Sequence, residues 1–270
     1  MLGLAGYIYY WHRKLAPIMA AKEVELVLTP YVLKPFNGPT RNINLGFARL
    51  DIPATVPGEA MLADDTSFVV LKNGESPYLI LIGPPVSEVN KEMVDLMEEY
   101  FRLTGNRADS LFDIKKRILL TQPFAVWDLP VLGKRRAISG AVLLTLKRDL
   151  AHAASKIQFI ETPEIGALIF TGTDKTVVSV FDKRRRVEQQ IFVMRGAADI
   201  DQFLAAVIPS YQFTSDDVGE AKWHEQALAA GLHPVKIARA AGAAELDPAS
   251  VAQIQAEVRR RRSHQAPDGK

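Results

Sequence analysis

Hydrophobic positions form short runs in two parts of the chain, and each set predicts strands. The runs 66–71 and 78–82 flank the turn-forming residues 72–77 and predict a β-hairpin. Neighbouring positions in both runs are apolar, so we expect strands that are covered on both faces. Four later runs at short spacing predict an antiparallel meander: 157–160, 167–170, 177–181 and 187–193.

Helical periodicity separates the two groups of strands and follows the second. A stripe of apolar residues predicts a helix that begins after the N-cap Ser87 and stops at Gly105. Ser110 and Asp113 have the spacing of a capping box, which predicts a second helix. Residues 134–154 predict a third helix whose centre is apolar nearly all round, so we expect it to be deeply buried.

The order of these elements is typical of an α+β fold. Asp199 predicts the start of a last core helix, and an antiparallel β-sheet sandwiched by helices is therefore expected over residues 45–213. A connector (16–44), in which residues 23–28 predict a short strand, precedes this domain. Residues 214–270 predict a helical, alanine-rich tail with a basic end.

The first 15 residues are a hydrophobic segment that ends in His12, Arg13 and Lys14. The uncharged part is too short to cross a bilayer, which takes about 20 apolar residues. Its end nevertheless has the pattern of a membrane interface, with aromatic rings followed by cations: Tyr9, Tyr10, Trp11, Arg13 and Lys14. Three interpretations of this segment remain open: a clipped or short membrane anchor, a helix that packs on the domain or on another subunit, and a degenerate signal sequence.

The amino-acid composition argues against several kinds of functional site. The formal net charge is only +2, which argues against binding of nucleic acid. The chain has no cysteine, so disulfides, thiol catalysis and cysteine-based metal sites are excluded. No histidine pair has metal-binding spacing, and we expect no metal, cofactor or catalytic residue. The loop Gly172–Thr176 resembles a phosphate loop, but it lies between two predicted strands and is expected to be a hairpin turn.

Clustered cations are the candidate functional feature. Lys134, Arg135 and Arg136 form one cluster, which we interpret as a solvated helix start. Two longer clusters predict a patch for an anionic partner: Lys183, Arg184, Arg185 and Arg186, and Arg259, Arg260, Arg261 and Arg262. Four consecutive cations repel one another, so they reduce stability unless a partner uses them.

Two segments carry a family resemblance. The strand-then-proline sequence Phe47–Pro53 is similar to the opening of domains in the PsbP-like α/β/α sandwich superfamily, and Asp199–Val207 is similar to their closing helix. The order of elements over residues 45–213 resembles that superfamily as well. The chain also resembles bacterial proteins with a short hydrophobic N-terminus. The resemblance implies a non-catalytic binding or assembly domain and carries over no functional residue.

Together these patterns predict a membrane-associated, non-enzymatic protein-interaction domain. Residues 1–15 would tether it to a membrane, with the bacterial inner membrane favoured, and a protein partner of unknown identity is expected. Two alternatives stay open. One is a soluble enzyme whose site leaves no short motif. The other is a cytoplasmic oligomeric module whose first helix is buried between subunits.

Overall fold

In the computed structural model, the described residues are Ile18, 20–63, 69–72, 80–83, 85–87, Glu98, 100–102, 104–123, 129–214 and 220–235. The helices are α2 (Lys22–Glu25), α4 (Leu111–Leu119), α5 (Leu129–Leu150), α6 (Ile200–Ser210) and α7 (Glu220–Ala229). The first strands are β1 (Leu28–Pro30), β2 (Thr40–Asn44), β3 (Ala48–Pro53), β4 (Glu59–Ala63), β5 (Val69–Lys72), β6 (Ile80–Ile82) and β7 (Val86–Ser87). The later strands are β8 (Ala154–Glu161), β9 (Ile165–Gly172), β10 (Lys175–Asp182), β11 (Val187–Met194), β12 (Gln212–Phe213) and β13 (Pro234–Val235).

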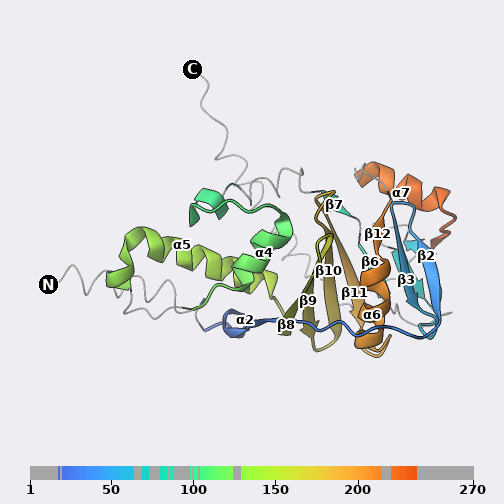
Figure 1. The fold of residues 1–270 in the computed structure, drawn as a ribbon, viewed down its shortest axis with the longest axis horizontal. Coiled ribbons are helices and arrows are strands. Elements are labelled where there is room, and N and C mark those ends of the chain that lie inside the picture. The colour runs from blue at the N-terminus through green and yellow to red at the C-terminus, as the bar shows by residue number, and fades with distance from the viewer. Residues whose placement is uncertain are drawn as a thin grey trace, which may run out of the picture. The chain divides into compact units, whose positions relative to one another are not determined.

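Most of the strands belong to one mixed sheet (Figure 1). Its order is β1-β8-β9-β10-β11-β6-β5-β4-β13, and β7 also pairs with β11. The predicted meander is confirmed as β8–β11, whose neighbours pair antiparallel, and the predicted early hairpin is confirmed as β5 and β6. Only the edge strands pair parallel within the described residues, β1 with β8 and β13 with β4.

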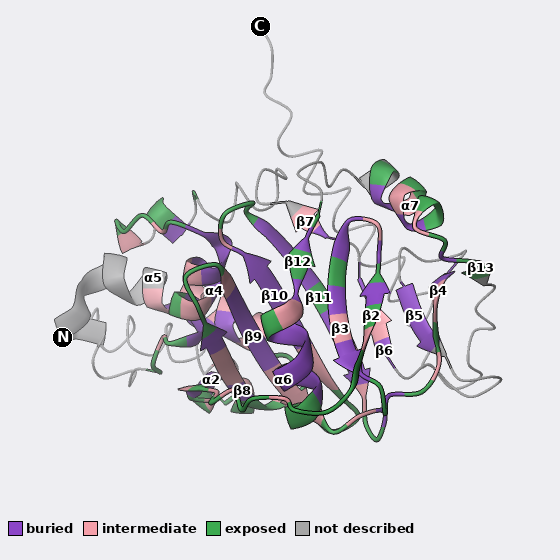
Figure 2. Cartoon of the chain, turned by 45° about the vertical axis from the view of Figure 1, so that its right-hand side comes forward, coloured by how far each residue is buried: buried purple, intermediate pink, exposed green. Residues whose placement is uncertain are grey.

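One face of this sheet is covered by a second, smaller sheet together with α6. The small sheet has the order β12-β3-β2. Alternate residues of the large sheet, such as Ile169 and Val178, pack in one core with Leu50 of β3 and with Phe203 and Leu204 of α6. Figure 2 shows buried residues along the strands of both sheets and on α6. These residues form the larger hydrophobic core.

Helices α4 and α5 cover the opposite face near β8–β10. Leu168 and Phe181 point to this side, because side chains alternate along a strand, and they pack with Leu111 and Phe112 of α4. Gly166 of β9 makes the contact with α4 possible, since a Cβ atom there would lie 2.5 Å from the Phe112 ring. The α+β fold with helices on both sides of a sheet is thus confirmed, with a small sheet as part of one cover.

Two of the three predicted helix caps are present, at Ser110 and Asp199. The Ser110 hydroxyl accepts a hydrogen bond from the backbone N–H of Asp113 at the start of α4. The Asp199 carboxylate accepts from the backbone N–H groups of Asp201 and Gln202 at the start of α6. These bonds satisfy donors that have no partner inside the helix, so both starts follow directly from the local sequence.

Three local predictions were wrong. Residues 23–25 are helical, and the expected strand begins only at Leu28. Ser87 does not cap a helix, because it lies in β7 and pairs with Val187 of β11. The described side chains of α5 are buried on one side only, with Leu144 fully buried and Val142 and Leu143 half-buried. At Ser87, strand pairing with β11 overrode the local helix signal.

The expected membrane segment and tail lie largely outside the described residues. The described residues all belong to one compact unit, which ends at Val235. Residues 1–15 are not among the described residues. In the described part of the chain, no helix combines the length and the apolar character needed to span a membrane.

Candidate functional site: the basic hairpin tip

Lys183, Arg184, Arg185 and Arg186 form the turn between β10 and β11, which we term the hairpin tip. Asp182 and Val187 are the last paired residues of the two strands. The backbone of Arg186 has φ 55°, in the left-handed region that glycine and asparagine adopt most readily. An arginine in this conformation costs about 1–2 kcal/mol, because its Cβ approaches the next carbonyl group. The turn therefore keeps a cation where a glycine would be less strained.

Asp182 stabilises the base of the hairpin tip. One carboxylate oxygen, Oδ1, accepts hydrogen bonds from the backbone N–H groups of Arg184 and Arg185, at 2.9 and 2.8 Å. The other oxygen accepts from the Arg185 guanidinium at 3.0 Å. The Asp182 residue is only 8% exposed. This Asx-type turn satisfies two backbone donors and fixes the start of the basic run.

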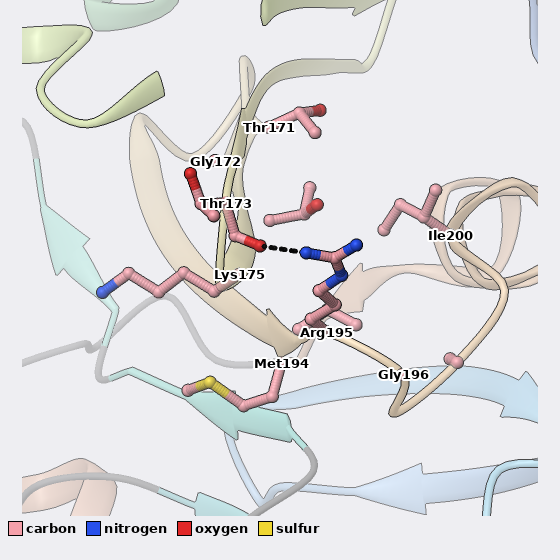
Figure 3. Close-up of a pocket in the computed structure, with 11 residues that line it drawn as sticks. Thr171, Gly172, Thr173, Lys175, Met194, Arg195, Gly196 and Ile200 are labelled. Carbon is pink, nitrogen blue, oxygen red and sulfur yellow. Dashed lines mark hydrogen bonds between the residues drawn. The ribbon is translucent and has the colours of Figure 1, made fainter. Parts of the chain in front are cut away.

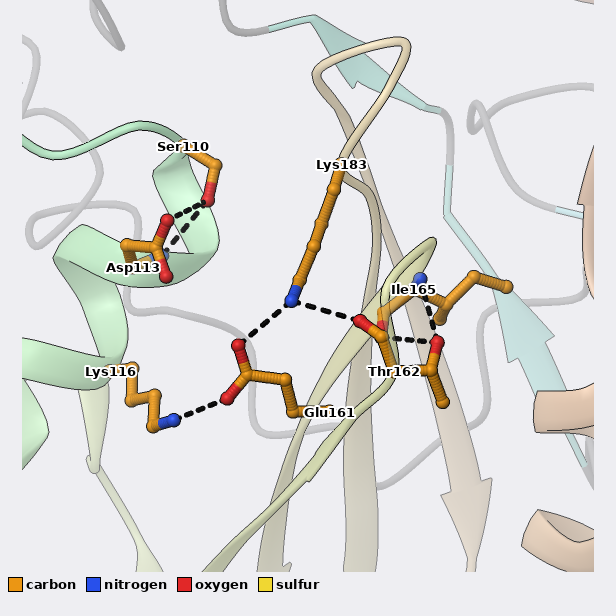
Figure 4. A network of polar contacts seen from close by, with 7 residues as sticks. All are labelled: Ser110, Asp113, Lys116, Glu161, Thr162, Ile165 and Lys183. Atoms are coloured by element: carbon orange, nitrogen blue, oxygen red, sulfur yellow. Dashed lines mark hydrogen bonds and ion pairs between the residues drawn. The ribbon is translucent and has the colours of Figure 1, made fainter.

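The charge of Lys183 is neutralised by an ion pair with Glu161. Its Nζ atom donates to Oε1 of Glu161 at 2.8 Å and to the backbone carbonyl of Thr162 at 3.0 Å. Figure 4 shows the Glu161 carboxylate between Lys183 and Lys116 of α4, and Lys116 donates to the other oxygen. Burial opposes ionisation of Glu161, but hydrogen bonds from the two lysines outweigh it and lower the pKa of this carboxyl. Lys183 thus joins the turn to β8 and α4.

Arg184 and Arg186 are exposed at the hairpin tip. Among the described residues, neither guanidinium takes part in an ion pair or a side-chain hydrogen bond. Arg185 is also exposed, but it already pairs with Asp182. The structure therefore divides the predicted patch into two internally paired cations, Lys183 and Arg185, and two that face solvent.

The remaining predicted site residues are not described. Arg259, Arg260, Arg261 and Arg262 lie outside the described residues, as do the predicted interface residues Tyr9, Tyr10, Trp11, Arg13 and Lys14. The structure therefore does not place them relative to the hairpin tip.

Sequence reasoning missed three residues that organise the hairpin tip: Asp182, Glu161 and Lys116. Asp182 directly precedes the basic run, and an aspartate at the start of a turn is a signal that could have identified its role. Glu161 and Lys116 are distant in sequence from the turn and leave no such signal. Within the described part of the chain, no group of three or more potential metal ligands comes together.

Comparison with known proteins found no match to a family model, to a curated protein or to a solved structure.

Proposed function

We propose that the protein is a non-enzymatic, membrane-associated interaction domain, and that its hairpin tip contacts anionic lipid headgroups. The observation that carries the proposal is the exposure of Arg184 and Arg186, which have no ion-pair partner among the described residues. The other two cations of the turn are internally paired. In this proposal the hydrophobic segment 1–15 supplies the attachment to a bacterial inner membrane, and the tip orients the domain on its surface.

The composition of the hairpin tip favours a lipid surface over an acidic protein. Protein interfaces depend on buried aromatic or aliphatic anchors, and the four turn residues contain none. A charged bilayer needs no such anchor, because it attracts each nearby lysine or arginine by about 1 kcal/mol. Arg184 and Arg186 together would then contribute about 2 kcal/mol, which is enough to orient a tethered domain but not to hold it alone.

Vesicle co-sedimentation of the full chain tests this proposal. Binding to phosphatidylcholine vesicles is compared with binding to vesicles that also contain phosphatidylglycerol. We expect the anionic vesicles to bind more protein at low salt. The double variant Arg184→Gln/Arg186→Gln should bind about 30-fold more weakly, since about 2 kcal/mol is lost. High salt should remove most of the difference by screening.

A matched control removes two exposed cations elsewhere. Lys34 and Arg49 are both exposed, and Lys34→Gln/Arg49→Gln changes the net charge by the same amount. We expect this control to bind nearly as well as the wild type. Equal losses in the two double variants would reject a specific role for the hairpin tip. A tip variant that loses affinity for polyglutamate but keeps affinity for vesicles would point to an acidic protein instead.

A further inference from the structure

An open pocket of about 350 Å³ lies at the other end of β10 and β11 from the hairpin tip. It forms where the turn between β9 and β10 meets the segment that leads from β11 into α6 (Figure 3). The volume is at the lower end of the range for small-molecule sites. Its described lining residues are Thr171, Gly172, Thr173, Lys175, Thr176, Val193, Met194, Arg195, Gly196, Ala198 and Ile200.

Of the two cations among the described lining residues, Lys175 and Arg195, the second is placed to bind a ligand. Figure 3 shows the side chain of Arg195 directed toward Thr173, whereas the side chain of Lys175 extends away from it. Lys175 Nζ instead lies 5.2 Å from the centre of the Phe192 ring. The Arg195 guanidinium makes one long hydrogen bond, 3.4 Å to the backbone carbonyl of Thr173. None of the described lining residues carries a carboxylate, so none of them is an acidic partner for Arg195.

Hydroxyl groups and apolar side chains complete the lining. Thr171, Thr173 and Thr176 each place a hydroxyl-bearing side chain at the pocket. These hydroxyls can donate hydrogen bonds to an anion beside the guanidinium. Four apolar side chains are among the described lining residues: Val193, Met194, Ala198 and Ile200. The lining therefore matches a ligand that has an anionic head and a short apolar body.

We propose that this pocket binds a small organic anion, with its charged oxygens on the Arg195 guanidinium and its apolar part against Val193, Ala198 and Ile200. A guanidinium presents a planar fork of donors that fits carboxylate and phosphate oxygens alike. The guanidinium thus selects a ligand head group for its negative charge and its oxygens, and the size of the pocket limits the apolar part of the ligand. The site is independent of the proposed membrane contact, because the two features lie at opposite ends of the hairpin.

Ligand-detected NMR titration of the full chain tests the proposal with four probes: hexanoate, hexyl phosphate, hexylamine and acetate. We expect hexanoate and hexyl phosphate to bind, and hexylamine, which has the opposite charge, not to bind. Acetate should bind at least several-fold more weakly than hexanoate because it lacks the apolar part. The ratio of the two anionic affinities then identifies the preferred head group.

Three variants provide the controls. Arg195→Gln should weaken hexanoate binding at least about tenfold, and Arg195→Lys should restore part of it, because the charge returns without the planar fork. Arg184→Gln, at the hairpin tip, should leave hexanoate binding unchanged. Equal binding of hexanoate and hexylamine, or unaltered hexanoate binding by Arg195→Gln, would overturn the proposal. Loss of vesicle binding with intact hexanoate binding would affect only the proposed function.

Discussion

Lys115 of α4 and Glu188 of β11 form an ion pair that is buried between the helix and the large sheet. Their Nζ and Oε2 atoms are 2.5 Å apart, and the side chains are only 11% and 5% exposed. The Lys115 ammonium also lies 5.6 Å from the centre of the Phe181 ring. The second Glu188 oxygen, Oε1, is buried and has no hydrogen-bond partner among the described residues. The pair therefore concentrates two desolvated charges at the contact between α4 and the sheet.

Removing one partner should be far more damaging than removing both. Glu188→Gln leaves the buried Lys115 cation uncompensated, which typically costs about 3–5 kcal/mol. With a urea m-value of about 2–3 kcal/mol/M, the unfolding midpoint should fall by about 1–2.5 M. In Lys115→Met/Glu188→Leu both charges are replaced by apolar groups, and the free energy of unfolding should stay within about 1 kcal/mol of wild type or exceed it.

Urea unfolding followed by circular dichroism measures these differences. Asp149→Asn is the control, because the ion pair of Asp149 with Arg148 is exposed, at 58% and 38%, and exposed pairs contribute about 1 kcal/mol or less. A loss of stability in Glu188→Gln no larger than in Asp149→Asn would refute the expected cost of an uncompensated buried charge. A double variant as unstable as Glu188→Gln would show that the loss comes from packing and not from an unpaired charge.

Two further changes test how single residues affect stability. Lys147 of α5 is 1% exposed, donates to the carbonyl of Thr121 and has a pKa lowered by burial from its usual 10.5. At pH values between this lowered pKa and 10.5, Lys147 is protonated in the unfolded chain but not in the folded chain. The free energy of unfolding of the wild type should therefore rise relative to that of Lys147→Met as pH increases toward 10.5. A difference in urea midpoints that does not change with pH would contradict this expectation. Arg186→Gly should stabilise the hairpin by about 1 kcal/mol, because glycine adopts φ 55° without strain. Arg186→Ala is the control, because it removes the same charge but keeps the backbone strain. A larger gain from alanine than from glycine in thermal unfolding would show that charge repulsion, and not backbone strain, limits this turn.

Local signals predicted much of the large sheet. The runs from 157 to 193 appear as β8–β11, and their short links favoured antiparallel neighbours. Consecutive apolar residues predicted strands covered on both faces, and Val69, Val70 and Leu71 are all fully buried. These features follow from near neighbours in the sequence, where turn residues and apolar periodicity carry the information.

Long-range pairing could not be read from the same signals. Thr40–Asn44 belongs to a segment that was expected to be a connector, yet it pairs with β3 in the small sheet. Ile43 is the single buried residue of this strand, and the polar residues around it give no apolar pattern from which a strand could be predicted. In the candidate site, the basic run was visible in the sequence. The ion pair that sets Lys183 apart depends on Glu161, which lies 22 residues away in the sequence and at the end of another strand.

The parallel edge strand has a consequence for synthesis of the chain. Leu28 pairs with Ile157, which the ribosome adds about 130 residues later. At about 5–20 residues per second, the N-terminal region emerges roughly 6–26 s before its partner strand exists. Residues Leu28–Pro30 must therefore wait without backbone partners from β8 during translation. The edge strand β1 can therefore join the large sheet only after β8 has been made.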